Sequence, residues 1–165
     1  MNLAAAIIVA CTGGGRLLEL KHAARNTAVL LSKGGVEFGR EHYPLIVAMH
    51  AGWLVAVLIL TPAERPISWP LLGLFVTLQL FRIWVIRTLG PWWTTRVIRV
   101  AGAPIIRSGP YRYCRHPNYV VVSLEIAVLP LIFGLRAVAV VFSILNALLL
   151  AWRIHIESAA LIRMA

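Results

Sequence analysis

The sequence predicts an all-α integral membrane domain with about five transmembrane helices, spanning residues 1–165. Hydrophobic residues make up 60% of the chain and charged residues only 13%, whereas charged residues are about 25% of a typical soluble domain. The apolar residues also come in long blocks, which is the pattern of membrane-spanning helices rather than of one soluble core. Both observations favour a multi-pass membrane protein.

The five apolar segments span residues 1–20, 43–60, 70–87, 119–133 and 135–152. The first is interrupted by Gly13-Gly14-Gly15, and we expect a first spanning helix that reaches about Leu20. Only Gly134 separates the last two, which predicts a tight helical hairpin. Both hairpin segments are short for a bilayer that needs about 20 residues per helix. We therefore expect protein rather than lipid to cover part of the hairpin.

The chain carries 16 Lys and Arg against 6 Asp and Glu, a net charge of +10. In a soluble protein this excess would suggest nucleic acid, but in a membrane protein basic loops mark the cytoplasmic side. We therefore expect no nucleic-acid partner. With the amino end outside, only Arg65 and Arg136 fall on the outer side, and Arg82 lies near a helix end. The basic residues then assigned to the cytoplasmic side are Arg16, Lys21, Arg25, Lys33, Arg40, Arg87, Arg96, Arg99, Arg107, Arg112, Arg115, Arg153 and Arg163.

The densest polar segment is residues 109–119, which reads Gly-Pro-Tyr-Arg-Tyr-Cys-Arg-His-Pro-Asn-Tyr directly before an apolar helix. Ionisable groups at the edge of a membrane need partners. Gly109-Pro110 is typical of a turn, and Pro117 biases His116 towards an extended backbone. A loop with a fixed backbone conformation that is rich in arginine and tyrosine indicates a cofactor site at the membrane surface, on the cytoplasmic side.

Three further elements can converge on this loop: the pair Arg153 and Glu157, the pair Trp92-Trp93, and the polar link 37–43. Arg153 and Glu157 are four residues apart and share one helix face. An exposed ion pair would explain them, but arginine before glutamate is the weaker order for such a pair. We therefore favour two separate ligands, because a guanidinium can hold a carboxylate or an enolate and a carboxylate can bind hydroxyls or an ammonium group. Trp92-Trp93 is more typical of an interfacial aromatic belt.

The run Tyr-Arg-Tyr-Cys-Arg-His-Pro-Asn-Tyr at 111–119, the hairpin after it, and the final Arg-Ile-His-Ile-Glu at 153–157 resemble the isoprenylcysteine carboxyl methyltransferase family, over about residues 103–161. Members of that family are integral membrane enzymes that use S-adenosylmethionine. The amino half, through Arg16-Leu-Leu-Glu-Leu20, Arg25-Asn26, Gly34-Gly-Val-Glu37 and His42-Tyr-Pro44, is similar to a bacterial subgroup. That subgroup is similar to small enzymes that methylate hydroxyls of phenolic or pyrone lipids, which implies the bacterial plasma membrane.

The resemblance implies a cofactor-binding half at about residues 90–165 and a role for each matching position. Arg153 would orient the acidic group of a lipophilic acceptor, either a prenylated cysteine carboxylate or the hydroxyl of an alkylpyrone or phenolic lipid. The residues implied to hold S-adenosylmethionine are Ala103, Pro104, Ile105 and Ile106 through their backbone, then Tyr111, His116, Pro117, Asn118, Tyr119 and Glu157. Two positions depart from the family: a histidine often stands where Ala103 is, and a second glutamate where Ser158 is.

Two other classes of function stay open. A non-enzymatic scaffold could bind anionic lipid headgroups through the basic loops, but this explains neither the tyrosines nor the His-Pro pair. A haem or quinone protein could use His50 with a partner histidine, but His50 stands alone inside a span and is more typical of a satisfied core histidine. The two cysteines, Cys11 and Cys114, are too few for a disulfide framework or a zinc site, and no metal is expected.

Overall fold

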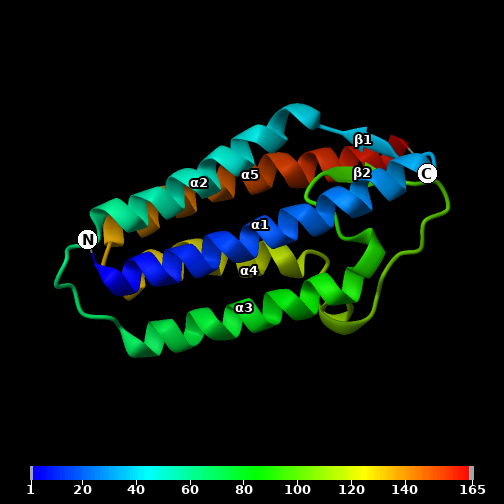
Figure 1. Cartoon of the computed structure of the whole chain (residues 1–165). Helices are drawn as coiled ribbons and strands as arrows, with labels where there is room; N and C mark the ends of the chain where they lie inside the picture. The colour runs from blue at the N-terminus through cyan, green and yellow to red at the C-terminus, as the bar shows by residue number, and fades with distance from the viewer. Residues whose placement is uncertain (1, 164–165) are drawn as a thin grey trace.

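The computed structural model describes residues 2–163, with side chains through Ala160. It confirms an all-α fold: a long bundle of five helices lying roughly side by side (Figure 1). The helices are α1 (Leu3–Ser32), α2 (Tyr43–Leu60), α3 (Trp69–Leu89), α4 (Pro117–Ile132) and α5 (Arg136–Arg163). The α2–α3 and α4–α5 connections share one end with the amino terminus, and the other connections share the opposite end with the carboxyl terminus (Figure 1).

Four of the helices, α1, α2, α3 and α5, are long and apolar enough to cross a membrane. At 16 residues, α4 is about 24 Å long, less than the roughly 30 Å of a hydrocarbon core. Nine of its residues are buried against other helices. The prediction that protein covers part of the hairpin is therefore confirmed, and the turn is made at Gly134, which has φ +69°.

The predicted end of the first helix is wrong, because α1 runs through the three glycines and continues to Ser32. In lipid, a helix satisfies every backbone hydrogen bond internally, so glycines do not end it as they often do in water. The start of α1 is fixed by Asn2, which accepts a hydrogen bond from the Ala5 amide (3.0 Å). The last helix continues beyond the apolar segment that ends at residue 152, and α5 carries Arg153 and Glu157 on one helix, as predicted.

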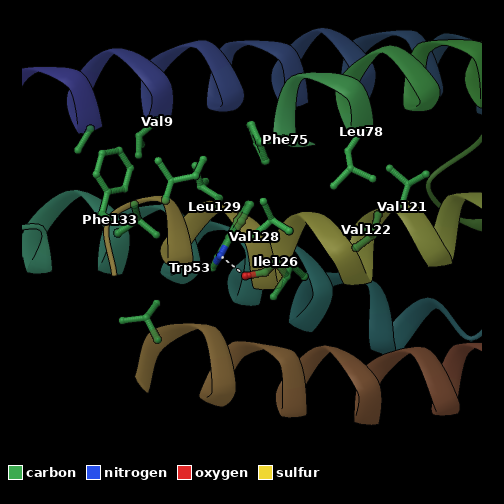
Figure 2. Close-up of a cluster of buried hydrophobic side chains, with 14 of the residues drawn as sticks. Val9, Trp53, Phe75, Leu78, Val121, Val122, Ile126, Val128, Leu129 and Phe133 are labelled. Carbon is green, nitrogen blue, oxygen red and sulfur yellow. Dashed lines mark hydrogen bonds between the residues drawn. The ribbon is translucent and has the colours of Figure 1, made fainter. Parts of the chain in front are cut away.

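The main hydrophobic core surrounds α4, which packs against α3 and α5 and also contacts α2 (Figure 2). Trp53 of α2 is 1% exposed, and its indole nitrogen donates to the Ile126 carbonyl of α4 at 3.1 Å. Phe75 and Leu78 of α3 reach the opposite side of α4. The short helix is therefore held on both sides, and the residues at its first turn are placed by a well-packed core.

A two-stranded antiparallel ribbon, which the sequence did not predict, closes the end of the bundle that holds the carboxyl terminus. It pairs β1 (Val36–Phe38) with β2 (Val97–Arg99), with Glu37 opposite Ile98. The chain then turns at Gly39, which has φ +59° and lies so close to α5 that an added Cβ would be 2.6 Å from Ile156 Cδ1. The ribbon thus brings the link before α2 and the loop after α3 against the end of α5.

Candidate functional site

A cluster of three polar side chains joins the first turn of α4 to the last part of α5. Arg153 Nε donates to Tyr119 Oη at 2.7 Å and to Glu157 Oε1 at 3.2 Å. The Tyr119 hydroxyl donates to Glu157 Oε1. Arg153 is 8% exposed, so this is not an exposed helix-end ion pair. Arg153 and Glu157 contact each other in this structure, and their roles as two separate ligands stay a prediction.

The loop before α4 and the segment after α3 complete this cluster. The His116 ring stacks on the Tyr119 ring, with centroids 4.9 Å apart and planes 2° from parallel, and His116 Nδ1 lies 3.5 Å from Glu157 Oε2. Arg153 Nη1 donates to the Thr95 carbonyl at 2.7 Å. Pro117 is buried at the start of α4, which leaves His116 outside the helix with φ −129°. The loop, the segment and both helices therefore converge on the Arg153–Glu157 pair.

The polar link before α2 reaches the same place. Thr95 Oγ1 donates to Tyr43 Oη at 3.3 Å, and the Arg96 guanidinium lies 4.8 Å from the centre of the Tyr43 ring. His42 is buried, 6.0 Å from the Trp152 ring of α5. All four elements singled out in the sequence thus meet at one end of the bundle.

Of the sequence-predicted residues, the four at 103–106 lie apart from the cluster, whereas Tyr111 lies beside it. Ala103, Pro104, Ile105 and Ile106 lie in an irregular loop; Ile105 is 77% exposed, and none of the four lines the cavity beside Tyr119. Tyr111 packs against the small core of Ala23, Val85 and Trp93. Burial, with the nearby Glu157 carboxylate, raises the pKa of Tyr111 well above its ordinary value. Its hydroxyl is therefore protonated at neutral pH and can donate a hydrogen bond.

A cavity of about 380 Å³ opens beside the cluster, between α1, α2, α4 and α5. Its walls are mainly apolar, and Asn118, Tyr119 and Arg153 line one part of it. Two buried polar atoms on the lining residues, Asn118 Oδ1 and Trp93 Nε1, have no hydrogen-bond partner within residues 2–163. An apolar pocket with a few convergent polar groups is the usual form of a small-molecule site. Trp93 was predicted to lie in an aromatic belt, but it is 4% exposed and belongs to this wall.

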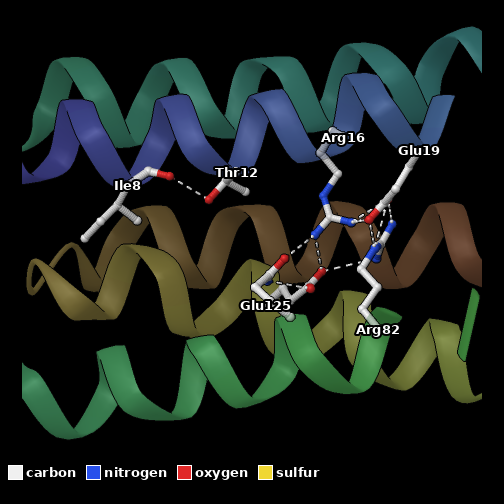
Figure 3. A network of polar contacts seen from close by, with 7 residues as sticks. Ile8, Thr12, Arg16, Glu19, Arg82 and Glu125 are labelled. Carbon is white, nitrogen blue, oxygen red and sulfur yellow. Dashed lines mark hydrogen bonds and ion pairs between the residues drawn. The ribbon is translucent and has the colours of Figure 1, made fainter. Parts of the chain in front are cut away.

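A second polar cluster lies deeper in the bundle, and the sequence reasoning missed it (Figure 3). Glu125 Oε2 of α4 accepts from Arg16 Nη2 of α1 at 2.9 Å and from Arg82 Nη1 of α3 at 3.2 Å. Glu19 of α1 pairs with the same two arginines at 2.8 and 2.7 Å, and Gln79 donates to Glu125 Oε1 at 2.7 Å. Two positive and two negative charges balance, which is how ionisable groups persist inside a membrane.

This second cluster changes the assignment of Arg16, which was expected in a cytoplasmic loop but lies inside the bundle. The available signal was Glu125, an acidic residue within the apolar segment 119–133, because an ionisable residue in a span requires a partner. Arg16, Glu19 and Arg82 also line the cavity described above. The cavity therefore lies between the two polar clusters.

Comparison with protein families gives a match that covers the residues of the cluster. A model of the isoprenylcysteine carboxyl methyltransferase (ICMT) family matches residues 71–163, which include the loop before α4, Tyr119, Arg153 and Glu157. The chain belongs to the ICMT family. Membership indicates a membrane methyltransferase, in agreement with four helices that are long and apolar enough to span.

Two curated relatives resemble the chain over nearly its full length. A Bacillus subtilis (strain 168) protein, described as uncharacterized protein YpbQ, is 36% identical over 150 residues, which cover 88% of this chain and 89% of the relative. A Haemophilus influenzae protein, described as uncharacterized, is 28% identical over 162 residues, which cover 94% of this chain and 93% of the relative. No solved structure gives a significant match.

Proposed function

We propose that this ICMT-family protein is an S-adenosylmethionine-dependent O-methyltransferase whose acceptor is a lipophilic molecule dissolved in the membrane. The observation that carries the proposal is the apolar cavity within the helical bundle, which has the Tyr119–Arg153 pair on its wall. A polar substrate would not need such a cavity. A scaffold that binds lipid headgroups would not need a buried arginine fixed by three hydrogen bonds.

The residues beside the cavity fit S-adenosylmethionine as methyl donor. Glu157 offers a carboxylate that can accept from an ammonium group or from ribose hydroxyls, and Asn118 Oδ1 is a buried acceptor with no partner among the described residues. Stacked His116 and Tyr119 present flat ring surfaces. Bound there, S-adenosylmethionine would supply an activated methyl group. The contacts of Ala103–Ile106 stay a prediction, because this loop lies apart from the cluster.

Arg153 is the residue we assign to the acceptor. Tyr119 Oη, Glu157 Oε1 and the Thr95 carbonyl fix its Nε and Nη1, and Arg153 also lines the cavity. A fixed guanidinium can hold an anionic oxygen in line for methyl transfer, where orientation supplies much of the rate. A carboxylate arrives ionised and needs no general base. A phenolic or enolic hydroxyl loses its proton before or during transfer, and the positive charge of Arg153 favours that loss.

The acceptor's tail would enter from the lipid between α1 and α2. Leu17 of α1 and Val47 of α2 both line the cavity and are 68% and 39% exposed, so this wall faces outward as well as inward. Gly13 lines the cavity on the same side of the bundle. An acceptor head could then reach Arg153 while its tail stays in the membrane.

We also propose that the site faces the cytoplasm of a bacterial plasma membrane. Arg16 and Arg82 lie inside the bundle, so they count toward neither side of the membrane. Most of the remaining basic residues lie at the end of the bundle that holds the site. Only Arg65 and Arg136 belong to the connections at the other end. This asymmetry fits the positive-inside rule.

A methyl-transfer assay in nanodiscs tests the proposal, with labelled S-adenosylmethionine offered to a farnesylated cysteine analogue and to a long-chain alkylresorcinol or alkylpyrone. We expect transfer to one acceptor class. Glu157→Gln should lose cofactor binding, and Arg153→Gln should keep cofactor binding but lose turnover. Glu64→Gln and Arg136→Gln, which change exposed residues at the far end, are matched controls. No measurable cofactor binding by the wild-type protein, together with binding to anionic vesicles, would instead support the scaffold.

A further inference from the structure

His50 lies on the cavity wall, deeper in the bundle than the Arg153 cluster. Tyr43 marks the depth of that cluster, because it contacts Thr95, whose carbonyl accepts from Arg153. His50 is seven residues further along α2, which is about 10 Å of helix. The histidine is half-buried and sits 6.4 Å from the Trp53 ring in an edge-on arrangement.

The hydrogen bonding of His50 fixes which ring nitrogen carries the proton. Nδ1 lies 2.8 Å from the Ile46 carbonyl, one turn back on α2. A carbonyl only accepts, so Nδ1 is the N–H donor, and Nε2 of the neutral ring is an acceptor. The ring makes no other hydrogen bond within residues 2–163. Since Nδ1 turns back to the α2 backbone, Nε2 lies on the ring edge away from that backbone.

The other polar side chains at this depth already bind one another. Arg16, Glu19 and Arg82 belong to the balanced cluster of Figure 3. Asn146 Nδ2 donates to Ser123 Oγ at 3.1 Å. A ligand can therefore donate a hydrogen bond to His50 Nε2 without breaking an existing contact within the protein.

His50 of α2 and Arg153 of α5 also line the same cavity. The start of α2 and the end of α5 lie at the same end of the bundle (Figure 1), with His50 further from that end than Tyr43. One ligand in the cavity can therefore contact Arg153 and, deeper in the bundle, His50.

We propose that His50 is a specificity-determining residue, whose Nε2 accepts a hydrogen bond from a second hydroxyl of a ring-shaped acceptor head while the reacting oxygen lies at Arg153. This rests on the proposed function and narrows its acceptor to a ring with two hydroxyl groups. The carboxylate of a prenylated cysteine has no proton to donate at neutral pH. An acceptor head without the donor would leave Nε2 buried and unpaired, which disfavours its binding.

Binding of two short probes tests this inference: 5-pentylresorcinol, which has two ring hydroxyls, and 3-pentylphenol, which has one. Dissociation constants would be measured for wild-type protein in nanodiscs, for His50→Phe, and for the control His155→Phe, which changes an exposed histidine of α5. We expect the wild type and the control to prefer the resorcinol by roughly tenfold, the worth of one hydrogen bond. His50→Phe should bind both probes equally, with unchanged affinity for S-adenosylmethionine.

Nitrogen-15 NMR of labelled histidine gives a second readout that does not depend on activity. The His50 spectrum, assigned by its loss in His50→Phe, should show Nδ1 protonated and a Nε2 signal that shifts with the resorcinol and shifts less with the phenol. Equal binding of the probes by wild type, a preference that survives in His50→Phe, or no resorcinol binding at all would each overturn the inference. Failure of the proposed function is distinct, since it requires that neither cofactor binding nor methyl transfer occurs.

Discussion

Glu125→Gln should cause a large loss of stability, because it removes one buried charge from a balanced cluster of four. Glu125 is 2% exposed and accepts from Arg16 and Arg82 at 2.9 and 3.2 Å. At an effective dielectric constant of about 20, unit charges 3 Å apart attract by about 5–6 kcal/mol. Desolvation offsets much of this attraction, and removing one partner of a buried pair costs about 3–5 kcal/mol. Glutamine keeps the shape and one acceptor oxygen, so we expect a loss near the lower end, about 3 kcal/mol.

The free energy of unfolding would be measured by titration with SDS in mixed micelles, beside Glu64→Gln as the matched control, because Glu64 is exposed. The control should unfold like the wild type. Adding Arg82→Gln to Glu125→Gln restores charge balance, with Arg16 and Glu19 still paired, and should recover part of the loss. If Glu125→Gln unfolds like the control, the four charges do not stabilise the bundle and the reasoning is refuted.

Three further predictions concern the cavity, the turn before α2 and the buried tyrosine. Gly13→Leu should fill the cavity and weaken acceptor binding by roughly tenfold or more without changing cofactor affinity in a binding assay, whereas Gly14→Leu, with open space around it, should change neither. Gly39→Ala should lower the free energy of unfolding by more than about 2 kcal/mol, and the control Gly102→Ala by about 1 kcal/mol. Both glycines have left-handed backbone, but only at Gly39 would the added Cβ clash with a neighbouring side chain.

The third of these predictions follows from the raised pKa of Tyr111. Above pH 10.0, its ordinary value, the unfolded chain ionises while the folded protein does not. Stability should therefore fall as the pH rises above 10, and Tyr111→Phe should reduce that fall in unfolding curves measured across alkaline pH. An identical pH dependence in the variant would contradict the assignment.

Much of the fold could be read from local pattern. The second helix was predicted at residues 43–60 and found at Tyr43–Leu60, because an apolar run between prolines needs no tertiary information to form a helix in lipid. The hairpin at Gly134 followed in the same way. The first helix was misjudged at its glycines, and the short ribbon of Val36–Phe38 and Val97–Arg99 was missed, because its two strands are far apart in sequence and only three residues long.

The candidate site was likewise predicted only in part from the sequence. The family signature drew attention to Tyr119, Arg153 and Glu157, and the structure brings them together. The family signature did not indicate that Arg153 and Glu157 contact each other. The cavity, its wall at Trp93 and the free nitrogen of His50 depend on how helices rotate against one another, which hydropathy does not record.

The sequence by itself determined that this is a helical membrane protein with a basic, polar end and the signature of a methyltransferase family, because hydropathy and motif spacing are local properties. Only the tertiary structure decided which polar groups in the spans are paired and which are free for a ligand. Arg16 and Glu125 are 109 residues apart in the chain and 2.9 Å apart in space. Their pairing is set by the relative depth and rotation of α1 and α4, which the packing of the whole bundle fixes.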